Sequence, residues 1–443
     1  MEEILELVAT KQYTKLKEIL AAMEPADIAY LYADMPEHNM PLLYRLLPKE
    51  LAAEVFVELD ADMQEMLIRG FSDSELKEML DELYLDDAVD IIEEMPANVV
   101  KRIIMHTEPE MRDRINEVLN YPKDSAGSIM TIEFVDLKED MTVKDAFTRI
   151  RRTGLDKETI YTCYVTDKNR ILMGTVSAKD LLLADEECVI ADIMEKNPIY
   201  VNTLDDKEDV VLALSKYDLL AMPVVDNEQR LVGIVTVDDA IDVLQEEATE
   251  DIEKMAGITP SEKPYLKTGI FDTCRQRIPW LLILMVSATF TGMIISHYED
   301  AIGTYVILTS FIPMIMGTGG NSGSQSSVTV IRGLSLEEIE FKDIFRIIWK
   351  ELRVAIICGV VLAIATYLKV ILIDGGTPII AMVVALTIMF TVILAKIVGC
   401  MLPLLAKKVG FDPAVMASPF ITTIVDALSL VVYFGIASFI LKI

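Results

Sequence analysis

Residues 231–257 read LVGIVTVDDAIDVLQEEATEDIEKMAG and join a strand to a long acidic helix. The apolar run LVGIV predicts a buried strand, and the polar residues after it predict the start of a helix. No helix-breaking residue follows until Gly257, so we expect one continuous helix. Its acidic residues recur at spacings of three or four and form one stripe: Asp239, Asp242, Glu246, Glu250 and Glu253. A stripe of like charges either faces open water or binds a cation.

The strand and helix start of this stretch occur twice in the chain. GTVSAKD at 174–180 matches GIVTVDD at 233–239, 59 residues later, and each follows an apolar strand and a polar turn. The duplication resembles a tandem pair of CBS modules, which regulate by binding nucleotides or ions and do not catalyse. It implies ATP as a candidate ligand near Ser177 and Asp180, with Asp239 at the equivalent second position. The alternative is that the hydroxyl residues only cap the helices that follow.

Charge divides the chain near residue 260. Residues 1–260 hold 58 Asp and Glu against 26 Lys and Arg, a net of −32, whereas residues 261–443 hold 12 against 14, a net of +2. The acidic part argues against nucleic acid as a partner, because phosphate backbones are bound by clustered Lys and Arg. It attracts cations, although a merely solvated surface is the alternative. Five scattered cysteines and three distant histidines predict neither a disulfide framework nor a soft-metal catalytic centre, and we expect no enzyme.

Residues 1–130 predict short helices and little else. Their apolar residues recur at helical spacing, and Pro36, Pro48 and Pro96 interrupt the pattern. The repeated look predicts a small stack of helix pairs. The acidic N-terminus lacks the basic region and apolar core of a signal peptide, so membrane targeting must come from internal helices.

Residues 263–443 contain apolar segments long enough to cross a hydrocarbon core of about 30 Å. We place five spans, at 279–296, 301–331, 354–373, 377–406 and 413–441. Lys and Arg gather at one set of their ends: Lys263, Lys267, Arg275, Arg277, Arg332, Lys342, Arg346, Lys350, Arg353, Lys407 and Lys408. The opposite ends carry only Lys369 and Lys442. This asymmetry predicts a plasma-membrane protein with a cytosolic acidic domain and an external C-terminus. Lys396 lies inside the fourth span, and the sequence assigns it no function.

The second predicted span contains PMIMGTGGNSGSQSS at 313–327, which is unlike an ordinary membrane helix. Glycines and a proline surround Asn321 and Gln325, and this composition favours a broken or exposed backbone. Such a backbone survives at membrane depth only when it is buried in protein or lines a wet cavity. We therefore interpret Gly320, Asn321 and Gln325 as part of a substrate path. Close packing between helices is the alternative.

Asp426 lies 13 residues into the fifth predicted span. A carboxylate at that depth is costly and is a functional-site hypothesis by default. It belongs to a polar stripe with spacings of four, four, three and four: Ser418, Thr422, Asp426, Ser429 and Tyr433. We interpret this stripe as a pore wall, the alternative being a hydrogen bond to another helix. Within the five predicted spans there is no second carboxylate.

At these motifs the chain resembles the bacterial MgtE family of Mg²⁺ channels over essentially its full length. The most specific matches are GTGGNSGSQSSVTVIRGL, EEATEDIEKMAG and PFITTIVDALSLVVYF. The resemblance implies a multidomain α plus α/β fold with a helical N-domain (1–130), a tandem CBS pair (131–238), a connecting helix (239–262) and a five-helix transmembrane domain (263–443). It also implies a homodimer in the lipid bilayer, without an obligate protein partner. Its pore would lie on the two-fold axis between spans two and five.

The resemblance assigns roles to individual residues. Asp426 of each subunit would hold a largely hydrated Mg²⁺, which suits an ion that dehydrates reluctantly. The pore lining would comprise Gly320, Asn321, Gln325, Ser418, Thr422 and Ser429. Regulatory Mg²⁺ would bind at Glu54, Asp86, Asp90, Asp206, Glu208, Asp218, Asp239, Asp242, Glu247, Glu250, Asp251 and Asp412. Lys179 stands where the family pattern leads us to expect an arginine, which puts the nucleotide site at Asp180 and Ser177 in doubt.

Three functions therefore compete at this point. The first is a Mg²⁺ channel for uptake, gated shut by cytosolic Mg²⁺. The second is a divalent-cation exchanger coupled to H⁺ or Na⁺, in which Asp426 would relay protons; no inverted repeat supports it. The third, a membrane-anchored CBS sensor without transport, leaves the polar stripe and the glycine-rich segment unexplained.

Overall fold

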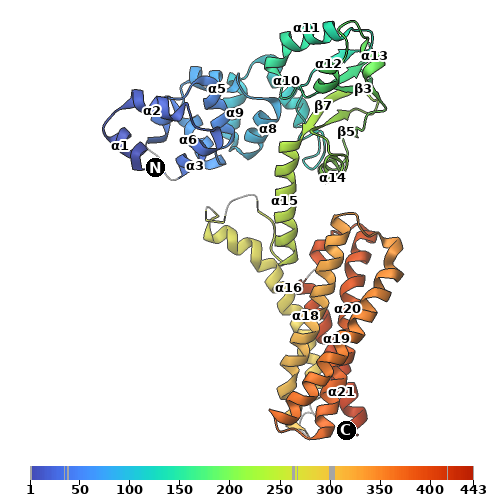
Figure 1. Cartoon of the computed structure of the whole chain (residues 1–443). Coiled ribbons are helices and arrows are strands. Elements are labelled where there is room, and N and C mark those ends of the chain that lie inside the picture. The colour runs from blue at the N-terminus through green and yellow to red at the C-terminus, as the bar shows by residue number, and fades with distance from the viewer. Residues whose placement is uncertain are drawn as a thin grey trace. The chain divides into compact units, whose positions relative to one another are not determined.

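The computed structural model describes residues 2–33, 35–36, 39–261, 265–266, 268–298, 305–416 and 418–442. The chain divides into two compact units, Met1–Leu244 and Gln245–Ile443, and each is described by itself (Figure 1). The first is mixed α and β, whereas the described part of the second is entirely helical. The multidomain α plus α/β class expected from the sequence is confirmed.

The first unit begins with short helices, as the proline-punctuated sequence predicted. Helix α3 packs on α5, α5 on α7 and α7 on α9, so that alternate helices form a stack. Pro48 and Pro96 each immediately precede a helix, where a missing N–H costs nothing. The bounds are α1 Glu2–Ala9, α2 Tyr13–Leu20, α3 Pro25–Ala33, α4 Met40–Tyr44, α5 Lys49–Val57, α6 Ala61–Gly70, α7 Asp73–Leu80, α8 Leu85–Glu94, α9 Ala97–His106 and α10 Pro109–Val118.

Two small sheets follow, one for each copy of the duplicated motif. The first has the order β1-β2-β3-β4 and the second the order β5-β6-β7. The strands of the two sheets are β1 Asp136–Lys138, β2 Thr162–Thr166, β3 Leu172–Ser177, β4 Glu195–Lys196, β5 Val201–Asn202, β6 Ala221–Val225 and β7 Leu231–Thr236. The helices around them are α11 Val143–Thr153, α12 Ala178–Leu183, α13 Ile190–Ile193, α14 Lys207–Tyr217 and the start of α15 Val237–Met255, with a 3₁₀ turn η2 at Gly154–Asp156.

The two hairpins share one register. Val165 pairs with Gly174 in the first, and Val224 pairs with Gly233 in the second. The valines of the two pairs are 59 residues apart in the sequence, and so are the glycines, which is the separation of the two motifs. Each hairpin also has a shift in register, directly after Val165 in the first and directly after Val224 in the second. The duplication read from the sequence is therefore a duplication in three dimensions. Apolar side chains from the N-terminal helices and the second sheet form one core in this unit.

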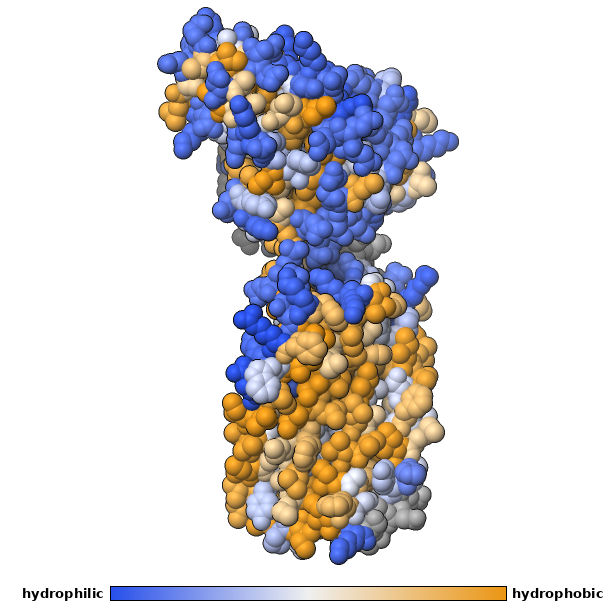
Figure 2. Space-filling view, turned by 90° about the vertical axis from the view of Figure 1, so that its right-hand side faces the viewer, coloured by the Kyte–Doolittle hydropathy of each residue, from blue (hydrophilic) through white to orange (hydrophobic). Residues whose placement is uncertain are grey.

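The second unit contains long helices packed side by side. They are α16 Ile270–His297, α18 Ile312–Ser335, α19 Ile344–Leu372, α20 Pro378–Val409 and α21 Ser418–Leu441, with 3₁₀ turns η3 Val306–Phe311, η4 Phe341–Asp343 and η5 Pro413–Met416. Helix α20 contacts α18, α19 and α21, and α18 also contacts α21. Much of the surface of this unit that Figure 2 shows is hydrophobic.

Four segments among the described residues are long and apolar enough to cross a membrane: Ile270–His297, Phe341–Leu372, Pro378–Val409 and Pro413–Leu441. They correspond to the first, third, fourth and fifth predicted spans. The second predicted span is represented by α18, whose glycine, serine and amide residues make it less apolar. Residues 301–304, at the start of that span, lie outside the described residues.

The expectation of a broken backbone at 313–327 is wrong. Helix α18 is continuous from Ile312 to Ser335, with Pro313 in its first turn, where proline fits. Its glycines instead allow close packing against α21. A methyl group placed on Gly320 would lie 2.8 Å from Thr422 Cγ2, and one on Gly323 would lie 2.8 Å from Ile421 Cγ2. Small residues let membrane helices approach closely, which compensates for their poor helix propensity.

Candidate ion path and acidic clusters

Asp426 lies on α21 in the segment that is apolar enough to span a membrane. Its Oδ1 atom is buried and accepts no hydrogen bond among the described residues. A buried carboxylate oxygen without a partner is costly in an apolar environment, unless something else compensates its charge. Asp426 therefore has the chemistry of a cation ligand whose cation comes from outside the chain.

The face of α18 nearest to Asp426 is known from its glycine contacts. Gly319 approaches Val425 and Ser429, Gly320 approaches Thr422, and Gly323 approaches Ile421. Along these contacts the residue numbers increase on α18 while they decrease on α21, so the two helices run antiparallel. Asp426 is one turn from Thr422 and thus lies near the level of Gly319 and Gly320.

The predicted lining residues divide into two groups. Gly320, Thr422 and Ser429 belong to the packed contact between α18 and α21, and the Ser429 side chain is buried. Asn321 and Gln325 are instead exposed, four residues apart on one face of α18. Tyr433, the last member of the polar stripe, is buried and donates a 2.9 Å hydrogen bond to the Leu308 carbonyl. The side chain of Ser418 lies outside the described residues.

A second carboxylate lies within the long helices. The sequence boundary at residue 354 left Glu351 outside the third span, but α19 begins at Ile344 and carries Glu351 in a half-buried position. Its Oε2 accepts a 2.6 Å hydrogen bond from Ser326 Oγ and lies 3.7 Å from Lys396 Nζ. The third predicted span began at residue 354, ten residues after the start of α19, and therefore did not include Glu351. Unlike Asp426, Glu351 has a cationic partner.

An acidic cluster, formed by Asp86, Asp87, Glu158 and Asp239, lies inside the first unit. Asp86 and Asp87 are in the first turn of α8, Glu158 precedes β2, and Asp239 is in the first turn of α15. Asp86 Oδ1 and Glu158 Oε2 are buried without a hydrogen-bond partner among the described residues. Three segments that are distant in sequence thus direct negative charge toward one another.

The carboxyl groups of this cluster resist ionisation. Burial, followed by repulsion from Asp239, raises the pKa of Asp86 well above its ordinary value and that of Asp87 to about 7. The same two causes raise the pKa of Glu158 to about 8. Burial raises the pKa of Asp239 to about 6, although a hydrogen bond from Thr236 opposes it. A divalent cation would remove both the repulsion and the unpaired burial.

Other predicted regulatory residues of the first unit lie apart from this cluster. Glu54 is exposed on α5, and Asp90 is exposed one turn after Asp86 on α8. Asp206 caps the start of α14 by accepting a 2.9 Å hydrogen bond from Glu208 N, whereas Asp218 ends the same helix in a left-handed conformation. The length of α14 places Asp206 and Asp218 about 18 Å apart, so one ion cannot bind both in one subunit.

The remaining predicted regulatory residues lie on α15 or near α21. Asp242 is exposed and Glu247 is half-buried. In the second unit, Lys254 Nζ forms ion pairs with Glu250 and, at 2.7 Å, with Asp412. Burial opposes the charge of Lys254, but its hydrogen bonds to these two carboxylates hold its pKa above the usual range. The lysine thus occupies a position that the sequence assigned to a metal ion.

Asp251 lies beside this lysine site on α15. Its Oδ2 accepts a 3.1 Å hydrogen bond from Ser335 Oγ at the end of α18. Burial raises the pKa of Asp251, and the nearby Asp412 adds to the shift. Within the described ranges, no group of three or more His, Cys, Asp or Glu side chains is arranged to hold a metal ion. Among the predicted regulatory residues, Asp86 and Asp239 meet in the acidic cluster of the first unit, and Glu250 and Asp412 meet at Lys254 in the second.

The predicted nucleotide residues have local partners. Ser177 Oγ accepts from Asp180 N at 3.1 Å and donates to Asp180 Oδ2 at 2.5 Å, which makes a capping box for α12. Thr236 donates to Asp239 in the same way at the start of α15. The capping role considered from the sequence is therefore present at the first motif, whereas at the second motif the hydroxyl of Thr236 hydrogen-bonds the carboxylate of Asp239.

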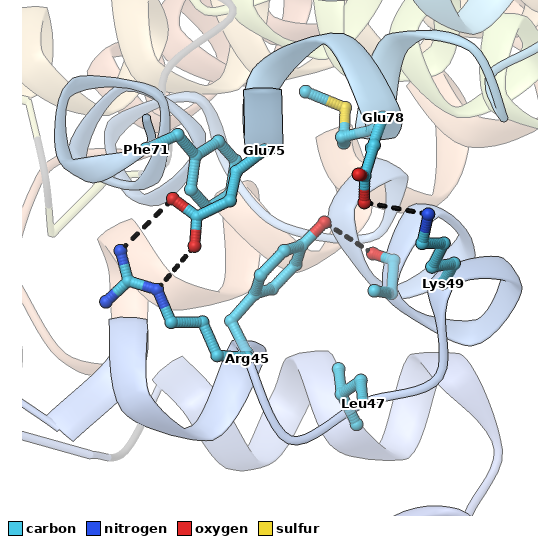
Figure 3. A pocket seen from close by; sticks show the side chains of 9 residues that line it. Arg45, Leu47, Lys49, Phe71, Glu75 and Glu78 are labelled. Carbon is cyan, nitrogen blue, oxygen red and sulfur yellow. Dashed lines mark hydrogen bonds and ion pairs between the residues drawn. The ribbon is translucent and has the colours of Figure 1, made fainter. Parts of the chain in front are cut away.

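A cavity of about 370 Å³ opens among the N-terminal helices, beside Tyr44 and Phe71 (Figure 3). Its charged residues are paired with one another. Arg45 Nε lies 2.7 Å from Glu75 Oε1, and Lys49 Nζ lies 2.8 Å from Glu78 Oε2. These pairs satisfy the charged rim, so we assign no ligand to this cavity.

Sequence reasoning missed several members of these sites. Asp87 and Glu158 were not selected, because nothing in their local sequence shows that they meet Asp239. Lys254 was not recognised as the partner of Glu250, although their spacing of four on one helix is a known signal for an ion pair. Glu351 was assigned to a loop.

Comparison with known proteins places this architecture in a family. Residues 312–436 match the model of a divalent cation transporter family, MgtE; residues 23–124 match the MgtE intracellular N domain, and 126–187 and 190–246 match CBS domains. The chain is 35% identical to the magnesium transporter MgtE of Thermus thermophilus, over 96% of this chain and 95% of that protein. It is 34% identical to MgtE of Bacillus subtilis, over 99% and 97%.

Solved structures agree with the sequence comparisons. The cytosolic domain of the Mg²⁺ channel MgtE in complex with ATP matches 54% of this chain and 98% of its own, with 36% identity and a TM-score of 0.52. The soluble part of a magnesium transporter matches 56% and 97%, with 33% identity and a TM-score of 0.53. Both the family models and the near full-length identity lead to one assignment. The chain belongs to the MgtE family of divalent cation transporters.

Proposed function

We propose that this chain forms a Mg²⁺ channel for magnesium uptake across the plasma membrane. The observation that carries the proposal is the carboxylate of Asp426, which is partly buried on an apolar helix and has one oxygen without a hydrogen-bond partner among the described residues. Mg²⁺ usually keeps several waters and is bound through one or two carboxylates, so few protein ligands suffice. The exposed Asn321 and Gln325 on α18 offer amide groups to a hydrated ion.

The proposed channel is a homodimer with its pore between α18 and α21 of both subunits. Two copies of Asp426 facing each other would favour divalent over monovalent cations, because two negative charges attract a doubly charged ion most strongly. In this arrangement the first unit is cytosolic and the C-terminus is external, as the basic residues at one set of helix ends indicate. Crosslinking of single cysteines introduced on α21 would test the two-fold arrangement.

Single-channel recording separates a channel from the alternative exchanger. The full-length protein in a planar bilayer should carry Mg²⁺ currents far above carrier turnover, without a requirement for a H⁺ or Na⁺ gradient. Mg²⁺ entry into proteoliposomes that depends on an opposing H⁺ or Na⁺ gradient would favour the exchanger instead. The presence of Glu351 does not favour an exchanger, since that carboxylate is paired with Lys396.

We also propose that cytosolic Mg²⁺ closes the channel through the first unit. The acidic cluster, Asp86, Asp87, Glu158 and Asp239, unites the N-terminal helices, the CBS pair and the start of α15. Bound Mg²⁺ would replace repulsion by bridging and so stabilise one arrangement of these elements. The other acidic residues implied by the family resemblance would contribute across a subunit boundary. Mg²⁺ currents should then fall as cytosolic Mg²⁺ rises through the millimolar range.

ATP is a second candidate ligand, at the CBS pair. The specific support is the related cytosolic domain, which was solved in complex with ATP. Asp180 would have to release its hydrogen bond from Ser177 to contact a ribose. Binding of a fluorescent ATP analogue to the purified full-length chain tests this, with Asp180→Ala expected to weaken binding. Unchanged binding in that variant would remove Asp180 from the site.

A further inference from the structure

A buried polar chain connects three of the long helices at a distance from Asp426. Lys396 Nζ on α20 donates a 3.2 Å hydrogen bond to Ser326 Oγ on α18, and Ser326 Oγ donates a 2.6 Å bond to Glu351 Oε2 on α19. The ammonium lies 3.7 Å from the same carboxylate oxygen. The side chains of Lys396 and Glu351 are only 7% and 13% exposed. This ion pair and its serine, here called the clamp, account for a lysine that the sequence left unexplained.

Charged side chains buried between membrane helices are tolerated only when a partner compensates their charge. Transfer of a single charge into a membrane interior is strongly unfavourable, whereas a close pair with a further hydrogen bond is tolerated. An uncharged contact between these helices would hold them together without this cost. A buried ion pair therefore contributes more to a defined arrangement than to stability, because its geometry allows few alternatives.

The clamp lies beside a close backbone contact between α18 and α20. Gly323 and Gly399 meet backbone to backbone, since a methyl group on Gly399 would overlap the Gly323 carbonyl. Ser326 follows Gly323 by three residues, and Lys396 precedes Gly399 by three, so both lie one turn from this contact on the same faces. The glycines permit close approach but carry no group that fixes rotation. The hydroxyl of Ser326, held by an ammonium and a carboxylate, supplies that restraint.

Rotation of α18 affects the residues that face α21 and the pore. Ser326 lies six residues from Gly320, or about 9 Å along the helix axis. Gly320 packs against Thr422, one turn from Asp426, and the exposed Asn321 and Gln325 flank the same stretch. A turn of α18 about its axis would move Asn321 and Gln325 relative to the Asp426 carboxylate. The clamp is thus close enough to set the geometry of the path, but it does not contact the ion.

We propose that Lys396, Glu351 and Ser326 are positioning residues that fix α18 against α19 and α20, and thereby set how the face of α18 toward Asp426 contributes to Mg²⁺ binding in the pore. The inference rests on the proposed function, because it assumes that Asp426 lines the path. It also assigns Lys396 a second consequence. By neutralising Glu351, the ammonium leaves Asp426 as the carboxylate of this region that is available to a permeant cation.

The test uses Ser326→Ala, which disconnects α18 from the ion pair without leaving a charge alone. Full-length protein is reconstituted in liposomes, and Mg²⁺ entry is measured over a series of external Mg²⁺ concentrations. We expect the concentration that gives half-maximal entry to change by at least about threefold, with a reduced preference for Mg²⁺ over Na⁺. Thr387→Val is the matched control, because Thr387 is a buried hydroxyl on α20 that bonds to the carbonyl of Val383 in its own helix. A merely structural role would lower the amount of folded protein but leave half-saturation and selectivity unchanged.

Substitutions of the charges sharpen the test. Lys396→Met should reduce Mg²⁺ entry at least tenfold and destabilise the protein, whereas Lys396→Arg should retain most entry. Lys396→Met with Glu351→Gln removes both charges and should restore thermal stability, but not the wild-type half-saturation. Lys408→Met controls for the lost positive charge, since Lys408 is exposed on α20 over the Phe341 ring. Wild-type half-saturation and selectivity in the folded double variant and in Ser326→Ala would overturn the proposal.

Failure of the clamp can be distinguished from failure of the proposed function. If Asp426→Asn abolishes entry while the clamp variants behave as wild type, only the clamp is refuted. If Asp426→Asn conducts normally, the proposed pore is wrong, and the clamp has no path to position.

Discussion

The acidic cluster of the first unit and the ion-paired carboxylates of the second unit have opposite electrostatic environments. In the first unit, Asp86, Asp87, Glu158 and Asp239 lie together, and none forms an ion pair with a described residue. In the second unit, carboxylates lie beside ammonium groups: Glu351 with Lys396, Asp412 and Glu250 with Lys254, and Asp374 with Lys369. Asp426 differs from these paired residues, since its buried Oδ1 has no hydrogen-bond partner in the part of the chain that the structure describes.

This difference indicates which carboxylates are suited to bind mobile cations. A carboxylate with its own lysine is neutralised by the chain, and it has little free energy to gain from Mg²⁺. A buried carboxylate without one gains both charge compensation and ligand contacts when an ion arrives. This reasoning supports the proposal that the acidic cluster senses Mg²⁺ and that Asp426 binds the permeant ion. The predictions below test this distinction between unpaired and paired carboxylates.

The largest effect is expected from the unpaired carboxylate of the second unit. Asp426→Asn keeps the size of the side chain but removes its charge, so Mg²⁺ entry should fall about a hundredfold or more, equivalent to about 3 kcal/mol in a barrier. Asp374→Asn is the control, because Asp374 already pairs with Lys369 at 2.8 Å. Proteoliposome uptake with a Mg²⁺ indicator measures both. Equal losses in the two variants would mean that pairing does not decide which carboxylate serves the ion.

The second largest effect concerns the acidic cluster. Replacing Asp86, Asp87 and Asp239 by Asn and Glu158 by Gln should leave the channel open at millimolar Mg²⁺, because nothing remains for Mg²⁺ to bridge. Patch currents at rising cytosolic Mg²⁺ measure this. Glu75→Gln with Glu78→Gln is the control, since these acids are paired with Arg45 and Lys49. Normal inhibition in the fourfold variant would show that the sensor is elsewhere.

The same cluster predicts a moderate dependence of stability on pH. Each carboxyl has a folded-state pKa above its ordinary value near 4, so folding favours the protonated form. Its contribution is greatest below pH 4 and is lost as the pH rises through about 6, 7 and 8, the pKa values of Asp239, Asp87 and Glu158. One pKa unit corresponds to about 1.4 kcal/mol.

In the presence of a chelator, limited proteolysis of the N-terminal helices should therefore be faster at pH 8 than at pH 6. Saturating Mg²⁺ should abolish the difference, because the ion compensates the charges that deprotonation creates. Mg²⁺ binding should in turn release protons. An equal pH dependence in the fourfold variant would assign the effect to other groups.

Many secondary-structure elements of the first unit could be predicted, because they are determined by residues that are close together in the sequence. The motif at 174–180 and its copy at 233–239 predicted two equivalent strand–turn–helix units, since strand, turn and helix start are encoded by neighbouring residues; the register itself came from the structure. The helix through EEATEDIEKM likewise ends at Met255, just before Gly257. The acidic cluster was only partly predicted, since Asp87 and Glu158 meet Asp239 through tertiary packing that no local pattern expresses.

The second unit shows what composition alone misreads. The glycines of 313–327 suggested a broken backbone, but glycine composition does not distinguish a break from a packing face; the contacts with Ile421 and Thr422 identify the packing face. Lys396 had no explanation, because hydropathy placed Glu351 outside the membrane helix. Hydropathy measures the average polarity of a window, and it does not register that two polar residues neutralise each other.

The smallest effect on Mg²⁺ inhibition is expected when the lysine of an ion-paired site is removed and its carboxylates are left without a cation. Lys254 holds Glu250 and Asp412 near one ammonium, so their carboxylates already converge on a common position. Lys254→Met would leave two negative charges there, repelling each other in a half-buried place. Mg²⁺ would relieve that repulsion, and the Mg²⁺ concentration for half-maximal inhibition should fall about two- to fivefold, or roughly 0.4 to 1 kcal/mol. Lys342→Met is the control, because Lys342 is exposed and, within the described ranges, forms its ion pair with Glu340. Patch currents against cytosolic Mg²⁺ measure both. Unchanged or weaker inhibition in Lys254→Met would show that unpairing a carboxylate is not sufficient to create a cation site.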